Sequence, residues 1–136
     1  MSHIDEYKVM ITRSRWFLDL AREAYRRQQY DLAVFLAEQA AQLRVKAALI
    51  RLAGHYPRVH SIRLLLGELA KASGNAGKKI IEFIKNNRSL LSELEDVYLI
   101  ARYAPKQYSR EDADDLITIA EKIIKLVEET ERGQEH

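Results

Sequence analysis

Apolar side chains recur along this chain at spacings of three, four and seven residues, and no stretch of useful length alternates between apolar and polar residues. The first pattern repeats one face of a helix, whereas a half-buried strand needs the second. The chain has only 5 glycines and 2 prolines in 136 residues, so little in it interrupts a helix. These features predict an all-α fold.

Turn residues divide the pattern into about five helices. Gly54 suits the position that ends a helix, Pro57 delays the start of the next, and Ser109 and Asp112 have the spacing of a capping box. We expect helices over residues 5–28, 30–53, 61–72 and 79–102, the fourth interrupted near residues 86–87, and a last helix from residue 109. Short loops favour a compact antiparallel bundle with a four-helix up-and-down core, a single domain over residues 1–136 with a frayed tail at 131–136.

The composition excludes several classes of chemistry. Without cysteine the chain can form no disulfide, thiolate metal site or thiol nucleophile, which fits a reducing cytoplasm. No window approaches the roughly 18 to 20 continuous apolar residues of a membrane span, so we expect a cytoplasmic protein that does not enter the membrane. The net charge of +2 does not indicate nucleic acid, and the arginines and aromatic residues that interleave in the first helix carry no DNA- or RNA-binding signature.

The charges are unevenly distributed. Residues 11–66 carry ten Lys or Arg against four Asp or Glu, whereas residues 109–136 carry four against nine. This asymmetry is typical of a basic face, of a solvated surface or of ion pairs between helices.

No motif for catalysis or for metal binding is present. The sequence lacks a G-x-S-x-G nucleophile motif, and the stretch from Gly74 to Lys79 lacks the spacing and the Ser/Thr of a phosphate-binding loop. His55 and His60 are five residues apart, and the arginines around them would repel a cation. We therefore expect no catalytic residue, no metal site and no cofactor.

The same arginines favour an anion. Arg44, Arg51 and His55 fall on one stripe of the second helix, and His60 and Arg63 lie at the start of the next, where the helix dipole also favours negative charge. The alternative is an exposed rim of arginines in which His60 caps the turn. The first interpretation predicts a phosphate or nucleotide site made of Arg44, Arg51, Arg58, His60 and Arg63.

Two blocks of the sequence resemble the HEPN family, the "higher eukaryotes and prokaryotes nucleotide-binding" domains. The first is YDLAVFLAEQAAQLRVKAALIRLAGHYPRVHSIRLLLGEL, residues 30–69, and the second is VYLIARYAPKQYSREDADDLITIAEKIIKLVEE, residues 97–129. The resemblance implies a helical bundle and gives a structural role to the family-matching residues, which are Tyr30, Gln39, Lys46, Gly54, Pro57, Arg102, Tyr103 and Pro105.

The chain also departs from the family pattern. Gln42 and Leu43 replace an acidic and a basic residue, Val59 replaces a threonine that would cap a helix, and Ala104 is inserted before Pro105. Ribonucleases of the family resemble one another in an arginine followed, after four to six residues, by a histidine, and no such pair exists here. The resemblance therefore implies a member without ribonuclease activity.

The resemblance further implies a homodimer that binds a nucleotide or phosphorylated ligand, a minimal nucleotidyltransferase protein, or both, in an arrangement similar to a toxin–antitoxin pair. The alternative is a protein–protein interaction module without ligand, in which the apolar second helix supplies the surface. A third hypothesis is a HEPN ribonuclease toxin with a site that the motif does not reveal.

Overall fold

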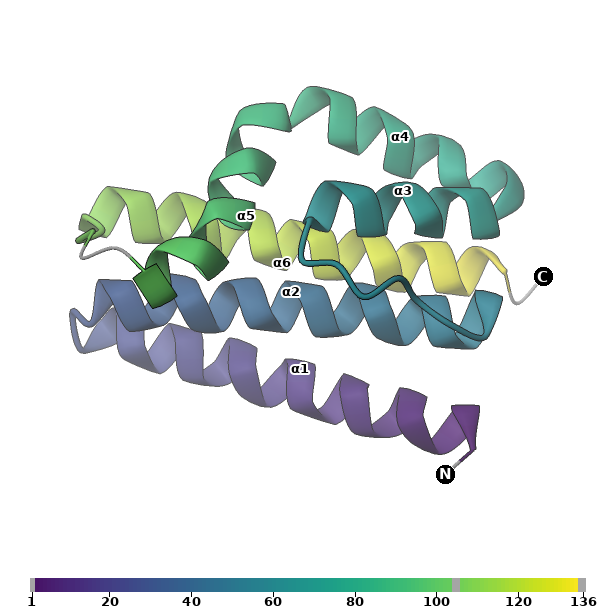
Figure 1. The fold of residues 1–136 in the computed structure, drawn as a ribbon, viewed down its shortest axis with the longest axis horizontal. Helices are drawn as coiled ribbons and strands as arrows, with labels where there is room; N and C mark the ends of the chain where they lie inside the picture. The colour runs from purple at the N-terminus through teal and green to yellow at the C-terminus, as the bar shows by residue number, and fades with distance from the viewer. Residues whose placement is uncertain (1, 104–105, 135–136) are drawn as a thin grey trace.

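The computed structural model describes residues 2–103 and 106–134, and these residues form helices joined by short turns and one longer loop (Figure 1). No strand occurs in this part of the chain, so the all-α prediction is confirmed. The helices are α1 (His3–Arg26), α2 (Tyr30–Ala53), α3 (Ile62–Ala72), α4 (Gly77–Asn86), α5 (Arg88–Tyr103) and α6 (Arg110–Gly133), with a 3₁₀ turn, η1 (Gly74–Ala76), before α4.

The fourth expected helix is divided in two at the position where an interruption was predicted. Asn87 separates α4 from α5, and its side-chain amide donates a hydrogen bond of 2.9 Å to the carbonyl of Phe83. An asparagine that bonds to a nearby backbone group competes with helix formation, which explains the break. The bundle thus has six helices where about five were expected.

Helix α2 is the centre of the bundle and packs against α1, α3, α5 and α6. Six alanines of α2 are fully buried, and small side chains allow the neighbouring helices to approach closely. At one such approach the hydroxyl of Ser14 on α1 donates a hydrogen bond of 2.7 Å to the carbonyl of Ala40. Leu49 is 2% exposed, so the apolar side of α2 at this residue is buried in the bundle and cannot supply a surface for a partner protein.

The order of the helices differs from simple up-and-down connection. Figure 1 shows that α1 runs opposite to α2 and that α3 runs opposite to α4, as short connections require, but that α2, α3 and α6 run in the same direction. Helices α2 and α3 run in the same direction because the loop over residues 54–61 returns along α2 before α3 begins. As a result α1 begins and α6 ends at the same end of the bundle.

The helix ends follow the predicted signals. Gly54 takes a left-handed conformation with φ of 82° at the end of α2, which favours glycine. Ser61 accepts a hydrogen bond from the backbone N–H of Leu64 and so caps α3. The capping box of Ser109 and Asp112 is complete, with bonds of 3.0 and 3.1 Å.

Residues 131–133 of the tail that was expected to fray continue α6 to Gly133, and residues 135–136 of that tail lie outside the described part of the chain. Val127 lies on the buried face of α6, and Glu131 continues that face one turn later and is only 3% exposed. The side-chain amide of Gln134 also donates a hydrogen bond of 2.6 Å to the carbonyl of Ser73. Burial and hydrogen bonding hold the last turn of α6 in place.

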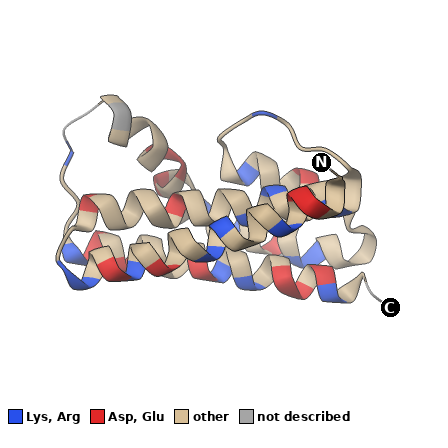
Figure 2. Ribbon diagram, turned by 90° about the horizontal axis from the view of Figure 1, so that it is seen from below, with Lys and Arg blue, Asp and Glu red and all other residues tan. Residues whose placement is uncertain are grey.

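Charged residues on the surface are mixed in sign. Figure 2 shows acidic and basic residues interspersed along the helices seen from below. Several pairs join the basic first half of the chain to acidic residues of α5 and α6, among them Arg22 with Glu121 and Arg63 with Glu95. Ion pairs between helices therefore account for part of the charge asymmetry of the sequence.

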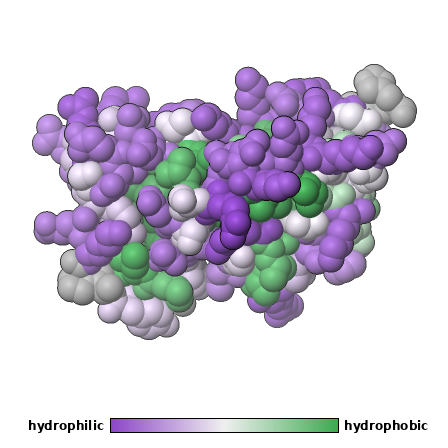
Figure 3. Space-filling view, turned by 90° about the horizontal axis from the view of Figure 1, so that it is seen from above, coloured by the Kyte–Doolittle hydropathy of each residue, from purple (hydrophilic) through white to green (hydrophobic). Residues whose placement is uncertain are grey.

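Seen from above, the surface is mostly hydrophilic, with apolar side chains in a band between polar ones (Figure 3). Among the described helices, none is long and apolar enough to cross a membrane.

Candidate functional site

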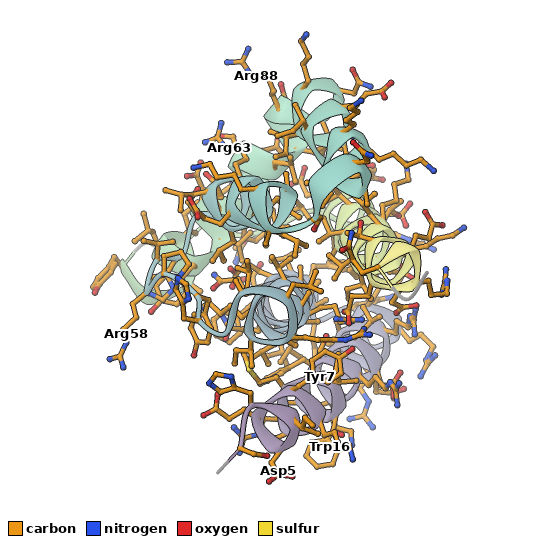
Figure 4. The ribbon with its side chains drawn as sticks, turned by 90° about the vertical axis from the view of Figure 1, so that its right-hand side faces the viewer. Asp5, Tyr7, Trp16, Arg58, Arg63 and Arg88 are labelled. Atoms are coloured by element: carbon orange, nitrogen blue, oxygen red, sulfur yellow. The ribbon has the colours of Figure 1, made fainter. Side chains whose placement is uncertain are left out.

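The structure divides the five predicted ligand-binding residues between two sides of α2. Arg44 and Arg51 face α1 and α6, where both pair with Glu131. Arg58, His60 and Arg63 belong to the loop and to α3, and Figure 4 shows Arg58 and Arg63 toward the left of the molecule, away from Tyr7. The loop over residues 54–61 turns away from the stripe of Arg44 and Arg51, so the five residues do not form one site.

Arg63 connects the start of α3 to α5. Its guanidinium donates hydrogen bonds of 2.9 and 2.8 Å to the two carboxylate oxygens of Glu95, and its backbone N–H donates a third. The hydroxyl of Ser61 also donates to Glu95 at 2.8 Å. Burial of Glu95 opposes its ionisation, but these hydrogen bonds outweigh it and lower the pKa of Glu95. This bidentate pair has a structural function.

His60 stacks on Tyr98 of α5, with 3.9 Å between ring centroids and 16° between ring planes. Its backbone carbonyl accepts a hydrogen bond of 3.2 Å from the side-chain amide of Gln42. Since Ser61 caps α3, His60 does not perform that function. Arg58 is exposed in the same loop.

The two remaining arginines form a compact cluster with Tyr7 and Glu131. Arg51 lies 2.6 Å from one carboxylate oxygen of Glu131, and the Tyr7 hydroxyl donates a hydrogen bond of 2.5 Å to the same oxygen. Arg44 pairs with the other oxygen. The guanidinium carbons of Arg44 and Arg51 lie 6.0 and 5.8 Å from the centre of the Tyr7 ring. Burial, followed by the hydrogen bond to Glu131, raises the pKa of Tyr7.

This cluster forms part of the wall of a cavity of about 400 Å³ between α1, α2 and α6. Ile11, Leu18 and Ile124 supply apolar wall, and Arg15 and Arg132 are exposed arginines at its edge. The charged lining residues are Arg15, Arg44, Arg51 and Arg132 against Glu128 and Glu131. Among these described lining residues, four basic side chains stand against two acidic ones, an excess that favours anions.

The sequence alone did not single out Tyr7, Arg15, Glu131 or Arg132 as site residues. A signal for Glu131 was present, because it lies four residues after Val127 on the apolar stripe of the last helix. A carboxylate that continues an apolar stripe needs a cationic partner in the fold.

A second buried carboxylate lies at Glu38 of α2, which is 1% exposed. The side-chain amide of Gln39 donates a hydrogen bond of 2.7 Å to it, and that of Gln42 donates to its other oxygen. Burial raises the pKa of Glu38 to about 7, although the two amides and the charge of Lys46 act in the opposite direction. Gln42, which departs from the family pattern, thus forms an intrahelical hydrogen bond in place of an ion pair.

The other family-matching residues lie mainly in packing positions. Tyr30 begins α2 and meets the Tyr25 ring edge-on, with 5.7 Å between centroids. The Lys46 ammonium lies 5.4 Å from the centre of the Tyr56 ring. Tyr103, at the end of α5, is 77% exposed.

Two of the family-matching positions lie partly or wholly outside the described part of the chain. Arg102 lies in α5, but its side chain is outside the described part, and Pro105 lies outside the described residues. Within the described ranges, no group of three or more His, Asp or Glu side chains is placed to hold a metal ion.

Comparison with known proteins identifies the fold. The family model of the HEPN domain matches residues 7–130. The crystal structure of an archaeal HEPN homologue is similar to this chain, with 27% sequence identity, a TM-score of 0.65, and coverage of 90% of this chain and 94% of the other. No curated protein matches the sequence.

Proposed function

Since this chain belongs to the HEPN domain family, we propose that it is a non-catalytic HEPN protein whose cavity between α1, α2 and α6 binds a phosphorylated ligand such as a nucleotide. The observation that carries the proposal is the convergence of Arg15, Arg44, Arg51 and Arg132 on one concave site.

The chemistry of the cavity fits such a ligand. Guanidinium groups form paired, charge-assisted hydrogen bonds to phosphate oxygens, and low-dielectric walls strengthen these bonds. The apolar wall of Ile11, Leu18 and Ile124 offers contact to the organic part of the ligand.

Thermal denaturation with AMP, ATP or GTP tests the proposal, because a ligand that binds only the folded state must raise the melting temperature. We expect an increase at millimolar nucleotide that is reduced in Arg15→Ala. Arg88→Ala is the matched control, because Arg88 is also exposed but lies away from the cavity (Figure 4). No stabilisation of the wild type would refute the proposal.

The non-catalytic part of the proposal rests on two observations. The arginine and histidine spacing of the family's ribonucleases is absent from the sequence, and none of the residues that line the cavity is a histidine. The histidine that would act in acid/base chemistry on a ribose hydroxyl is therefore missing from the described lining. Incubation with RNA should leave the RNA intact, and cleavage that depends on Arg44 or Arg51 would favour a ribonuclease toxin.

An interaction function is a second candidate, and exposed apolar residues of α1 favour it. Ile4, Trp16 and Leu20 are 67%, 62% and 54% exposed. Because Leu49 and its neighbours on α2 are buried, α1 is better suited than α2 to supply such a surface. We include in the proposal a homodimer, a minimal nucleotidyltransferase partner and a cytoplasmic location, as the family resemblance implies.

Light scattering of the protein alone and with its nucleotidyltransferase candidate tests the interaction function. We expect a mass above that of the monomer, and we expect Trp16→Ser to reduce it. A monomer under both conditions would refute this second candidate.

A further inference from the structure

We propose that the outer face of α1 binds the same face of a second copy of this chain. The two α1 helices lie antiparallel about a two-fold axis, and Trp16 of each copy enters a recess on the other. This inference rests on the homodimer included in the proposed function, and it identifies the interface and the residue at its centre.

The first argument is the exposed apolar surface of α1. This helix packs against α2 and, less extensively, against α6. Trp16 is 62% exposed, and Figure 4 shows it on the side of α1 that faces away from α2. Leu20 lies one turn later on the same face and is 54% exposed. Large exposed apolar side chains indicate an interaction surface, and tryptophan is enriched among the residues that dominate binding energy.

The second argument is a recess on the same face. A hollow of about 290 Å³ lies beside Trp16, and its other lining residues are Lys8, Val9, Thr12 and Arg13 of α1. The face therefore carries a protruding side chain and, toward the start of the helix, a recess. A two-fold axis between antiparallel copies places each Trp16 opposite the recess of the other copy, as a self-complementary interface requires.

The third argument is the distribution of charge on this face. Lys8 and Arg13 are exposed and form no ion pair with a described residue. Asp19 follows Trp16 by one turn; its side chain is 73% exposed and lies 3.6 Å from Arg22, beyond hydrogen-bond distance. In the antiparallel pair, Asp19 approaches the two cations of the other copy. A parallel pair would instead bring the cations of both copies together, so the charges favour the antiparallel arrangement.

Two variants alter the two halves of this contact at exposed positions. Trp16→Ser removes the protruding side chain, and Thr12→Glu fills the recess and places a negative charge before Asp19 of the other copy. The matched control is Ile81→Ser, because Ile81 is 53% exposed but belongs to α4, at the opposite edge of the bundle from α1 (Figure 1). We expect each of the first two variants to raise the Kd of the dimer at least about thirtyfold, and the control to leave it unchanged.

A mixture of the two variants tests the symmetry of the interface. When a Trp16→Ser copy meets a Thr12→Glu copy, the tryptophan of the second enters the open recess of the first, so one of the two contacts is intact. Sedimentation of the mixture should show more dimer than either variant shows alone at the same total concentration. No gain on mixing would overturn the inference.

The fluorescence of Trp16 gives an independent measurement, because the chain contains one tryptophan. Acrylamide should quench Trp16 less in the wild-type dimer than in Thr12→Glu, which keeps the tryptophan but is expected to be a monomer. The comparison holds even when the wild-type dimer does not dissociate on dilution. Equal quenching in a dimeric wild type and a monomeric variant would show that Trp16 lies outside the interface.

The outcomes separate this inference from the proposed function. If the wild type is a dimer that Trp16→Ser and Thr12→Glu leave intact, the interface is elsewhere, and this inference fails while the homodimer stands. If the wild type is a monomer at every concentration, both fail. If Trp16 becomes shielded only when the nucleotidyltransferase candidate is added, the face binds that protein, and the inference is overturned.

Discussion

Glu38 should make the stability of this protein depend on pH, and replacement by glutamine isolates that dependence. The side chain is almost fully buried, and burial raises its pKa from 4.5 to about 7. Between these two values the folded protein retains a proton that the unfolded chain has released. The folded state is therefore destabilised progressively as the pH rises through this window, and the effect levels off above the folded-state pKa.

The size of the effect follows from the two pKa values. A shift from 4.5 to about 7 corresponds to roughly 3 kcal/mol between the low-pH and high-pH limits. The amides of Gln39 and Gln42 and the charge of Lys46 are already included in that pKa. Because glutamine does not titrate, Glu38→Gln should become more stable relative to the wild type by about this amount as the pH rises.

Urea denaturation followed by circular dichroism, at pH values below, within and above this window, measures the difference between the two proteins. The matched control is Glu82→Gln, because Glu82 lies on α4 with an exposed side chain. A difference between wild type and Glu38→Gln that stays constant with pH, or that moves in the opposite direction, would refute the reasoning.

Three further predictions concern stability and can be checked by thermal or urea denaturation. Gly77→Ala should destabilise the protein by about 2 kcal/mol or more, because a Cβ there would lie 2.2 Å from the carbonyl oxygen of Ala70. Gly67→Ala is its control and should stabilise α3 by up to about 1 kcal/mol, since a Cβ there meets no atom within 4 Å. Equal effects of the two variants on stability would contradict the close approach of α3 and α4. Ser109→Ala should cost about 1 kcal/mol through loss of the capping box, and an unchanged melting temperature would count against that cap. Glu95→Gln should be destabilising at neutral pH, and the difference should shrink as the pH falls below the ordinary pKa of 4.5, because the native hydrogen bonds lower the pKa of Glu95; a difference independent of pH would contradict this.

The helices could be predicted from the sequence because their signals are local. The apolar spacing and the choice of residues at the ends, such as Gly54, Ser61 and Ser109, depend on neighbours within a few positions. The break at Asn87 was likewise visible, since an asparagine side chain competes with its own helix. The resemblance to the HEPN family added the expected bundle, which the family model and the archaeal structure support.

The candidate site could be predicted only in part. The spacing of Arg44 and Arg51 places them on one stripe, and the structure does bring them together. The sequence placed Arg58, His60 and Arg63 with them because they are near in the chain. The return of the loop over residues 54–61 along α2 separates them.

The sequence by itself determined that this protein is built of helices, where most of them begin and end, and which of their faces are apolar. Only the tertiary structure decided that Glu131, 80 residues from Arg51 in the chain, closes the cluster with Arg44 and Tyr7. The physical reason is that helix formation depends on contacts within a turn, whereas the pairing of charges depends on which helices pack together. That packing decides which charged side chains line the cavity between α1, α2 and α6.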